Sequence, residues 1–133
     1  MRDEKGEELG WKLLEEACEL FEAGERSRSI ELFHQAADLG SLEAQVNLGN
    51  IYDDGDGVTA DFEKARKLYL RAIGRGSPEG AYNLGISYRN RGNWRWARYW
   101  LGVAKSRGDE CADEELHALN ESPGAGVPSI KRK

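Results

Sequence analysis

Apolar residues recur every three or four positions along much of the chain, a spacing that places them on one face of a helix. Leu68, Tyr69 and Ala72 show the pattern clearly. Only three prolines occur in 133 residues, two of them within the last thirteen, so most of the chain is open to long helices. The pattern predicts seven helices, near residues 7–23, 26–39, 41–54, 61–75, 77–91, 94–107 and 110–120.

The predicted helices fall into pairs because the sequence repeats itself. Ala44–Tyr52 and Gly80–Tyr88 share Asn, Leu, Gly and Tyr at an offset of 36. The helices that follow, over Ala65–Gly76 and Ala97–Gly108, match at an offset of 32, since the loop of the second unit is four residues longer than that of the third. An earlier copy, which starts near Leu20, lies 68 residues before the third. One hairpin cannot bury its own apolar face, whereas stacked hairpins can.

Small and capping residues mark the same units. Gly49, Gly85, Ala65 and Ala97 are predicted to let the two helices of a pair approach closely. Glycines are predicted to end the second helix of each pair, and serines to cap the next helix. These residues are Gly40, Gly76 and Gly108, followed by Ser41 and Ser77.

The last predicted helix, near 110–120, repeats only the first half of the unit and has an acidic outer face, as a solvated capping helix should. The fold class predicted is therefore all-α: a right-handed α-solenoid of about three helical-hairpin repeats plus a capping helix. We expect this repeat domain to cover residues 1–120. Residues 121–133 contain Pro and Gly and end in a basic tip, which predicts a flexible C-terminal tail.

The second unit carries the most specific motif. From Leu48 to Ala72 the chain reads Leu-Gly-x-x-Tyr-x-x-Gly-x-Gly-Val-x-x-Asp-x-x-Lys-Ala-x-x-Leu-Tyr-x-x-Ala. This run resembles the Sel-one-like repeat, a relative of the tetratricopeptide repeat, and the loop at Gly55–Val58 is that family's signature. The first and third units have a shorter loop, like plain tetratricopeptide repeats. The resemblance covers about residues 10–120 and implies a scaffold that binds proteins or peptides and catalyses no reaction.

Motifs typical of catalysis or of metal binding are sparse. His34 and His117 lack a neighbouring pattern typical of a nucleophile system, so both are interpreted as structural or surface residues. Asp53–Gly57 is similar to a hard-cation loop, but Val58 and Ala65 stand where a calcium loop needs Asp or Asn and then Glu. We therefore expect no enzyme activity, no cofactor and no metal.

The net charge of −5 is unevenly distributed along the chain. Residues 1–65 carry 6 basic and 17 acidic side chains, residues 66–108 carry 10 and 1, and residues 109–133 carry 3 and 6. The chain therefore has an acidic first half and a basic third repeat, which are separate surfaces for partners.

The same composition bears on the compartment in which the chain acts. No apolar run approaches the ~20 residues of a membrane helix, and the first residues lead into no signal-peptide core. Cys18 and Cys111 lie far apart without a CxxC motif, which favours free thiols in a reducing cytosol over a disulfide. We expect a cytoplasmic protein with no membrane contact.

The repeat architecture implies that the first helix of each pair lines a concave groove. The register places six residues there that we expect to bind a partner: Asn47, Asn50, Tyr82, Asn83, Ile86 and Arg89. The groove would continue through Trp11, Leu14, Cys18 and Phe21. An amide donates and accepts hydrogen bonds at once and suits a peptide backbone, although local hydrogen bonding explains Asn47 and Asn83 equally well.

A second candidate surface lies on the third repeat. Trp94 and Trp100 correspond to apolar core positions of the second unit. Trp96 and Tyr99 correspond to Lys64 and Lys67, so with Val103 they predict an exposed aromatic stripe flanked by arginines, which is typical of interfaces. The alternatives are that the tail covers the stripe through Val127, Pro128 and Ile130, or that the stripe is simply exposed.

These surfaces favour three functional hypotheses. The first is a non-catalytic interaction module that holds a protein or peptide in the groove and on the basic third repeat; a narrower version is an immunity protein that caps a toxin. The second is nucleic-acid binding through the Arg- and Trp-rich third repeat, against which the acidic flanks argue. The third is self-association, either acidic units against the basic unit of a neighbour or a homodimer through the Trp96/Tyr99 face.

Overall fold

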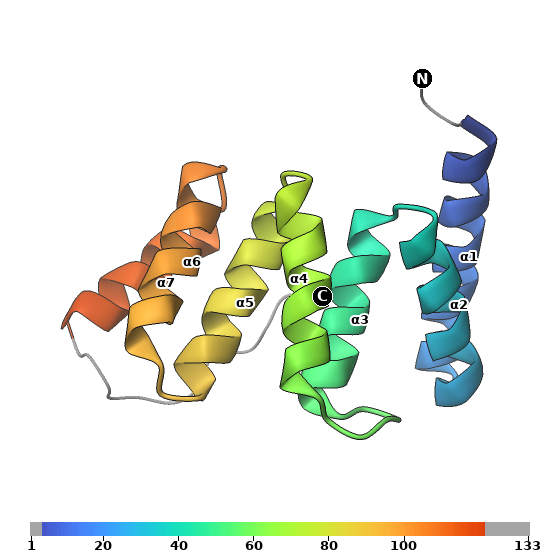
Figure 1. Cartoon of the computed structure of the whole chain (residues 1–133), viewed down its shortest axis with the longest axis horizontal. Coiled ribbons are helices and arrows are strands. Elements are labelled where there is room, and N and C mark those ends of the chain that lie inside the picture. The colour runs from blue at the N-terminus through green and yellow to red at the C-terminus, as the bar shows by residue number, and fades with distance from the viewer. Residues whose placement is uncertain (1–3, 122–133) are drawn as a thin grey trace. The chain divides into compact units, whose positions relative to one another are not determined.

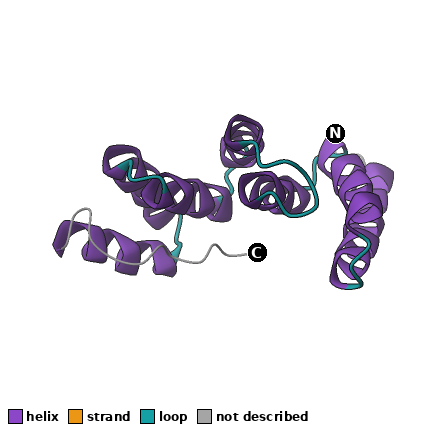
Figure 2. Cartoon of the chain, turned by 90° about the horizontal axis from the view of Figure 1, so that it is seen from below, coloured by secondary structure: helices purple, strands orange, loops and turns teal. Residues whose placement is uncertain are grey.

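The computed structural model describes residues 4–121, and these residues form seven helices and no strand (Figure 1). The helices are α1 (Glu4–Glu22), α2 (Arg26–Asp38), α3 (Leu42–Asp54), α4 (Phe62–Gly74), α5 (Pro78–Asn90), α6 (Trp94–Ser106) and α7 (Glu110–Glu121). Figure 2 shows that short loops join them. Every predicted helix is present, with ends within three residues of the prediction, so the all-α class is confirmed.

Two predictions concern the C-terminal end of the chain. Residue 121 was predicted to begin the tail, but Glu121 is the last residue of α7. The rest of the predicted tail, and with it the idea that Val127, Pro128 and Ile130 cover the aromatic stripe, lies outside the described residues.

No helix within residues 4–121 combines the length and the apolar character needed to cross a bilayer.

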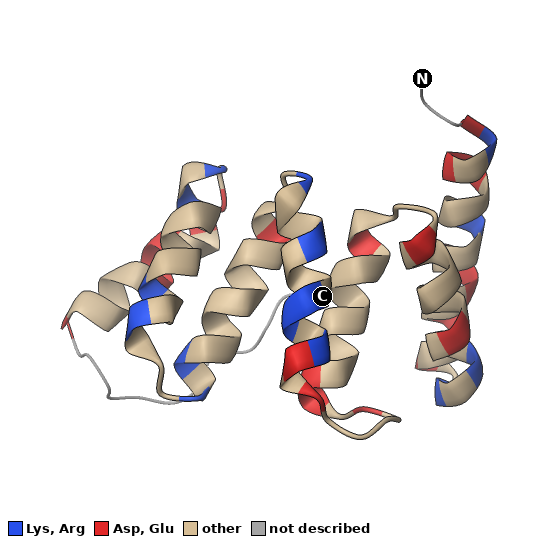
Figure 3. Ribbon diagram, viewed as in Figure 1, with Lys and Arg blue, Asp and Glu red and all other residues tan. Residues whose placement is uncertain are grey.

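The helices form two compact units that divide within α4. Unit 1 (residues 1–68) contains α1, α2, α3 and the first part of α4; unit 2 (residues 69–133) contains the rest of α4 with α5, α6 and α7. The described residues of unit 1 carry 7 basic and 16 acidic side chains, and those of unit 2 carry 8 and 7. Figure 3 shows acidic positions along α1, while six of the seven acidic residues of unit 2 belong to 109–121.

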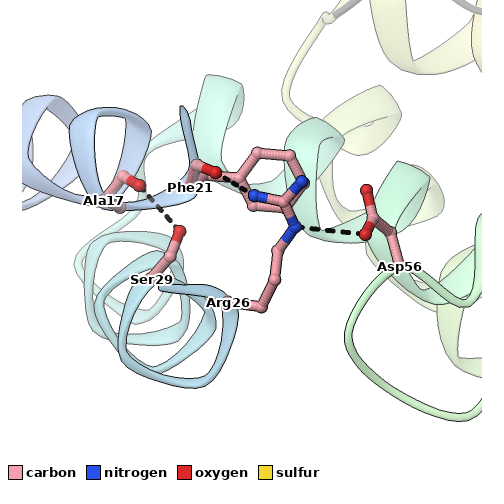
Figure 4. A network of polar contacts seen from close by, with 5 residues as sticks. All are labelled: Ala17, Phe21, Arg26, Ser29 and Asp56. Atoms are coloured by element: carbon pink, nitrogen blue, oxygen red, sulfur yellow. Dashed lines mark hydrogen bonds and ion pairs between the residues drawn. The ribbon is translucent and has the colours of Figure 1, made fainter. Parts of the chain in front are cut away.

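In unit 1, α1 packs on α2 and α2 on α3. Small residues let α1 and α2 approach: Ala17 and Ser29 are fully buried, and Ser29 Oγ donates a 2.7 Å hydrogen bond to the Ala17 carbonyl (Figure 4). A buried hydroxyl that satisfies a helix carbonyl costs little, whereas an unpaired one would be expensive.

The predicted helix ends are also confirmed. Ser41 Oγ accepts a hydrogen bond from Ala44 N at 3.2 Å and Ser77 Oγ from Gly80 N at 3.0 Å, so both serines are N-caps. The three glycines predicted to end the second helices all have positive φ, between 93° and 97°, a conformation that other residues adopt only with strain. Local sequence therefore sets where each hairpin turns.

The loop of the second repeat is fastened to the first repeat within unit 1 (Figure 4). Arg26, the first residue of α2, donates from Nε to Asp56 Oδ1 at 3.1 Å and also donates to the Phe21 carbonyl. Its guanidinium carbon lies 3.8 Å from the centroid of the Phe21 ring, a cation–π distance. Gly57 lies against the same side chain, since a Cβ there would stand 2.7 Å from Arg26 Cβ.

His34 takes part in a second cluster of unit 1, centred on Tyr52. His34 Nε2 and Tyr52 Oη are hydrogen-bonded at 2.8 Å, and Lys64 Nζ lies 4.4 Å from the Tyr52 ring centroid. Burial lowers the pKa of His34 below its ordinary 6.5, and the positive charge of Lys64 lowers it further, against the opposing effect of Asp38. Folding therefore favours the neutral imidazole.

This cluster predicts a pH dependence of stability. Since the pKa of His34 is lower in the folded chain, the unfolded chain binds more protons between that pKa and 6.5. The free energy of unfolding should fall as pH drops through 6.5, and His34→Gln should reduce that slope while retaining a side chain that can hydrogen-bond Tyr52. Urea unfolding at several pH values would measure it. His117→Gln is the control; equal slopes in wild type and His34→Gln would contradict the assignment.

Candidate partner-binding surface

The residues predicted to line the groove are mostly packed inside the units. Asn47 and Asn50 belong to α3 in unit 1, where Asn47 is half-buried and Asn50 is buried. The other four belong to α5 in unit 2: Tyr82, Asn83 and Ile86 are buried and Arg89 is half-buried. Asn83 and Ile86 have no exposed surface at all, so neither side chain is accessible to a partner in this fold.

The capping helix α7 contacts α5 at Arg89. Arg89, one turn after Ile86 on the same face, forms an ion pair with Glu115 of α7, and the two side chains are only 10% and 20% exposed. Asp109 begins α7 by accepting hydrogen bonds from Cys111 N at 3.0 Å and Ala112 N at 3.3 Å. On the face of α5 predicted to meet a partner, Arg89 is thus paired with α7 and serves the fold of unit 2.

The groove residues predicted in α1 are divided between core and surface. Leu14 is buried, Cys18 and Phe21 are half-buried, and Trp11 is 66% exposed. Burial raises the pKa of the Cys18 thiol, and the carboxylates of Glu43, Glu22 and Glu19 raise it further. A thiol held protonated in this way is a poor nucleophile.

The aromatic stripe of α6 lies at the surface, where the repeat register predicted it. Trp96 is 44% exposed and Tyr99 is 55% exposed. Trp94 and Trp100, predicted to be core residues, are half-buried. The reason is that Ala97, Leu101 and Ala104 supply the fully buried face of α6, which leaves both indoles at the edges of the core.

Four rings form one continuous cluster, which we call the aromatic surface: Tyr88 of α5 with Trp96, Tyr99 and Trp100 of α6. The centroids of Tyr88 and Trp96 are 6.3 Å apart, those of Trp96 and Tyr99 5.5 Å, and those of Tyr99 and Trp100 4.9 Å, the last two pairs edge-on. Edge-to-face contacts are favourable and hold the rings in place. Tyr88 was not among the residues predicted to contact a partner, although its register with Tyr52 was the available signal.

The charges around the aromatic surface are basic and incompletely paired. Within residues 4–121, the side chains of Arg95 and Arg98 make no hydrogen bond or ion pair. Other basic residues of unit 2 serve the fold: Arg107 Nη1 donates to the Ile73 carbonyl at 2.8 Å, and Lys105 pairs with Asp113 at 2.8 Å. An exposed, rigid aromatic cluster beside two unpaired guanidinium groups is suited to binding, not to acid–base or nucleophilic chemistry.

The Asp53–Gly57 loop, where we expected no cation site, has a structural role, because Asp56 forms an ion pair with Arg26. In the described part of the chain, no three His, Cys, Asp or Glu side chains are grouped so that they could hold a metal. Cys18 and Cys111 are both free thiols.

Comparison with known proteins identifies the fold. The Sel1 repeat family model matches residues 25–41 and 42–77, and the second match contains the Gly55–Gly57 loop. The chain is a Sel1-like repeat protein. The crystal structure of a Sel1 repeat protein from Oxalobacter formigenes is similar, with a TM-score of 0.67 and 26% identity over 82% of this chain and 88% of that one. The α-solenoid class predicted from the repeats is thereby confirmed.

Two curated relatives of this Sel1-like protein are larger. DAP3-binding cell death enhancer 1 of Rattus norvegicus is 33% identical over 109 residues, which are 77% of this chain and 20% of the relative. The exopolysaccharide production negative regulator of Rhizobium leguminosarum bv. viciae is 32% identical over 66 residues, 50% of this chain and 25% of the relative. The chain thus spans a quarter or less of the length of either relative.

Proposed function

We propose that this Sel1-like chain is a non-catalytic protein-interaction module that binds its partner through the aromatic surface. The observation that carries the proposal is the exposure of Trp96 and Tyr99, 44% and 55%, in a cluster whose rings already support one another. Aromatic residues and arginine are enriched among the residues that dominate binding energy. Side chains that are already ordered lose little entropy on binding.

Two further points support a protein as the partner. Sel1 repeats are in general protein-interaction modules, and one relative is named for its binding to a protein, DAP3. Nucleic acid is a weaker candidate, because the acidic residues of α7 lie in the same unit as the basic residues of α6 and Lys105 is already paired with Asp113. A phosphate backbone needs many unpaired cations.

Affinity capture with the immobilised chain tests the proposal. We expect Trp96→Ala/Tyr99→Ala to lower recovery of the wild-type partners at least about tenfold, since central aromatic residues commonly contribute 2 kcal/mol or more. Lys67→Ala is the matched control, because Lys67 occupies in α4 the repeat position of Tyr99 and is exposed. Quantitative mass spectrometry gives the readout, and unchanged recovery with the double variant would refute the proposed surface.

A further inference from the structure

The outer face of α6 contains a glycine that packing in unit 2 does not explain. Gly102 lies in the interior of the helix, one turn after Tyr99, where glycine weakens a helix relative to alanine. Among residues 4–121, a Cβ added there would meet no atom within 4 Å, whereas one added at Gly85 would stand 2.8 Å from Leu101 Cγ. Because Gly102 has no side chain, the surface of α6 is indented beside the exposed Tyr99. Such an indentation allows a second helix to approach closely.

The charge of this face restricts what can bind there. Arg95 lies one turn before Tyr99, and Arg98 lies immediately before Tyr99. Neither arginine side chain has a partner among residues 4–121. Pairing two α6 faces would bring these guanidinium groups toward each other. Residues 122–133 carry three basic and no acidic side chains, so the tail would be repelled as well. The face therefore favours an acidic helix with an exposed apolar residue.

The chain itself contains such a helix. α1 carries seven acidic and two basic residues, and its Trp11 is 66% exposed. Glu8 lies one turn before Trp11 and Glu15 one turn after it, so the indole stands between carboxylates. The side chain of Glu8 is 70% exposed, paired with Lys12 across a 3.5 Å gap at the surface, which leaves it available to another cation.

We infer that α6 of one molecule binds α1 of a second copy of this chain, with Trp11 against Trp96 and Tyr99 and with Glu8 and Glu15 facing Arg95 and Arg98. This inference rests on the proposed function, because it uses the same surface and names the partner. The two contacting surfaces are different, so every molecule offers one of each. Association by such a contact does not stop at a dimer unless it closes into a ring.

Two variants that each remove one side of the contact test it in the full chain. Trp96→Ala/Tyr99→Ala keeps α1 intact, and Glu8→Gln/Trp11→Ala/Glu15→Gln keeps α6 intact. In sedimentation velocity from micromolar to submillimolar protein at low salt, we expect the wild type to form dimers and larger species. Each variant alone should associate at least about tenfold more weakly. Their mixture should form a one-to-one dimer and nothing larger, because only one productive contact remains.

Gly102→Ala separates this role from folding. Alanine is the better helix former and meets no neighbour there, so the melting temperature should rise by about 2–4 °C, while association becomes weaker because the added methyl group holds α1 away. High salt should weaken wild-type association as well. A Gly102→Ala chain that associates as strongly as wild type would contradict the close approach over this residue.

The remaining outcomes each overturn the inference in a recognisable way. If the α1 variant still dimerises and the α6 variant does not, two α6 faces pair with each other. If the wild type is monomeric at every concentration, no second copy binds, and the aromatic surface is covered by the tail or left to a different protein. If Trp96→Ala/Tyr99→Ala then no longer captures a different protein that the wild type captures, the proposed function holds while the inference fails.

Discussion

Gly57→Ala is expected to destabilise the chain by about 2–4 kcal/mol, because the substitution has two separate costs. Gly57 has φ of 86°, where a residue with a Cβ is strained. Its Cβ would also stand 2.7 Å from Arg26 Cβ and 3.4 Å from Ile30 Cδ1. Arg26 cannot move away freely, since its guanidinium is bonded to Asp56 and stacked on Phe21.

Gly24→Ala is the matched control for that experiment. Gly24 has nearly the same φ, 88°, but a Cβ there would meet no atom of the described residues within 4 Å. It should therefore show the backbone cost alone, about 1–2 kcal/mol. Urea unfolding followed by circular dichroism measures both variants. Equal losses would mean that the loop of the second repeat does not depend on close packing against Arg26.

Gly85→Ala, the second large effect, should cost about 2 kcal/mol even though alanine is the better helix former. The new Cβ would lie 2.8 Å from Leu101 Cγ and 3.1 Å from Leu101 N. A backbone nitrogen cannot rotate out of the way, so α5 and α6 would have to separate. Leu101 is fully buried at this crossing, and the movement would loosen the core of unit 2.

The control for Gly85→Ala is Gly102→Ala on the facing helix, measured at low protein concentration so that association does not contribute. Gly102 has open space around its Cβ position, so this variant should gain about 0.5–1 kcal/mol from helix propensity. The same substitution at two glycines of one hairpin is thus expected to have opposite signs. A neutral or stabilising Gly85→Ala would refute the close approach of α5 and α6.

The sequence predicted features that depend on neighbouring residues. Helix positions follow from the apolar period, and hairpin ends follow from Ser41, Ser77 and the glycines with positive φ. The repeat register also placed Trp96 and Tyr99 at the surface, because Lys64 and Lys67 occupy the same positions one unit earlier. Small residues at Gly85 and Ala97 correctly predicted a close helix pair.

The sequence could not predict what covers each helix face. Asn83 and Ile86 were predicted to line a groove, but both are fully buried, and on the same helix Arg89 forms an ion pair with Glu115 of α7. The contact joins residues 26 positions apart, and no local pattern signals it. Arg26 likewise meets Asp56 from 30 positions away.

The period of the apolar positions and the capping residues determined by themselves that this chain is a set of helical hairpins, because helix period and capping are properties of neighbouring residues. The motif from Leu48 to Ala72 carried the resemblance to the Sel1 repeat. Only the tertiary structure decided which predicted contact residues remain accessible. It buried Asn83 and Ile86 and left Trp96 and Tyr99 exposed beside Arg95 and Arg98, which have no ion-pair partner among residues 4–121. Burial depends on what packs across from a side chain, and that partner is set by the fold and not by the neighbouring sequence.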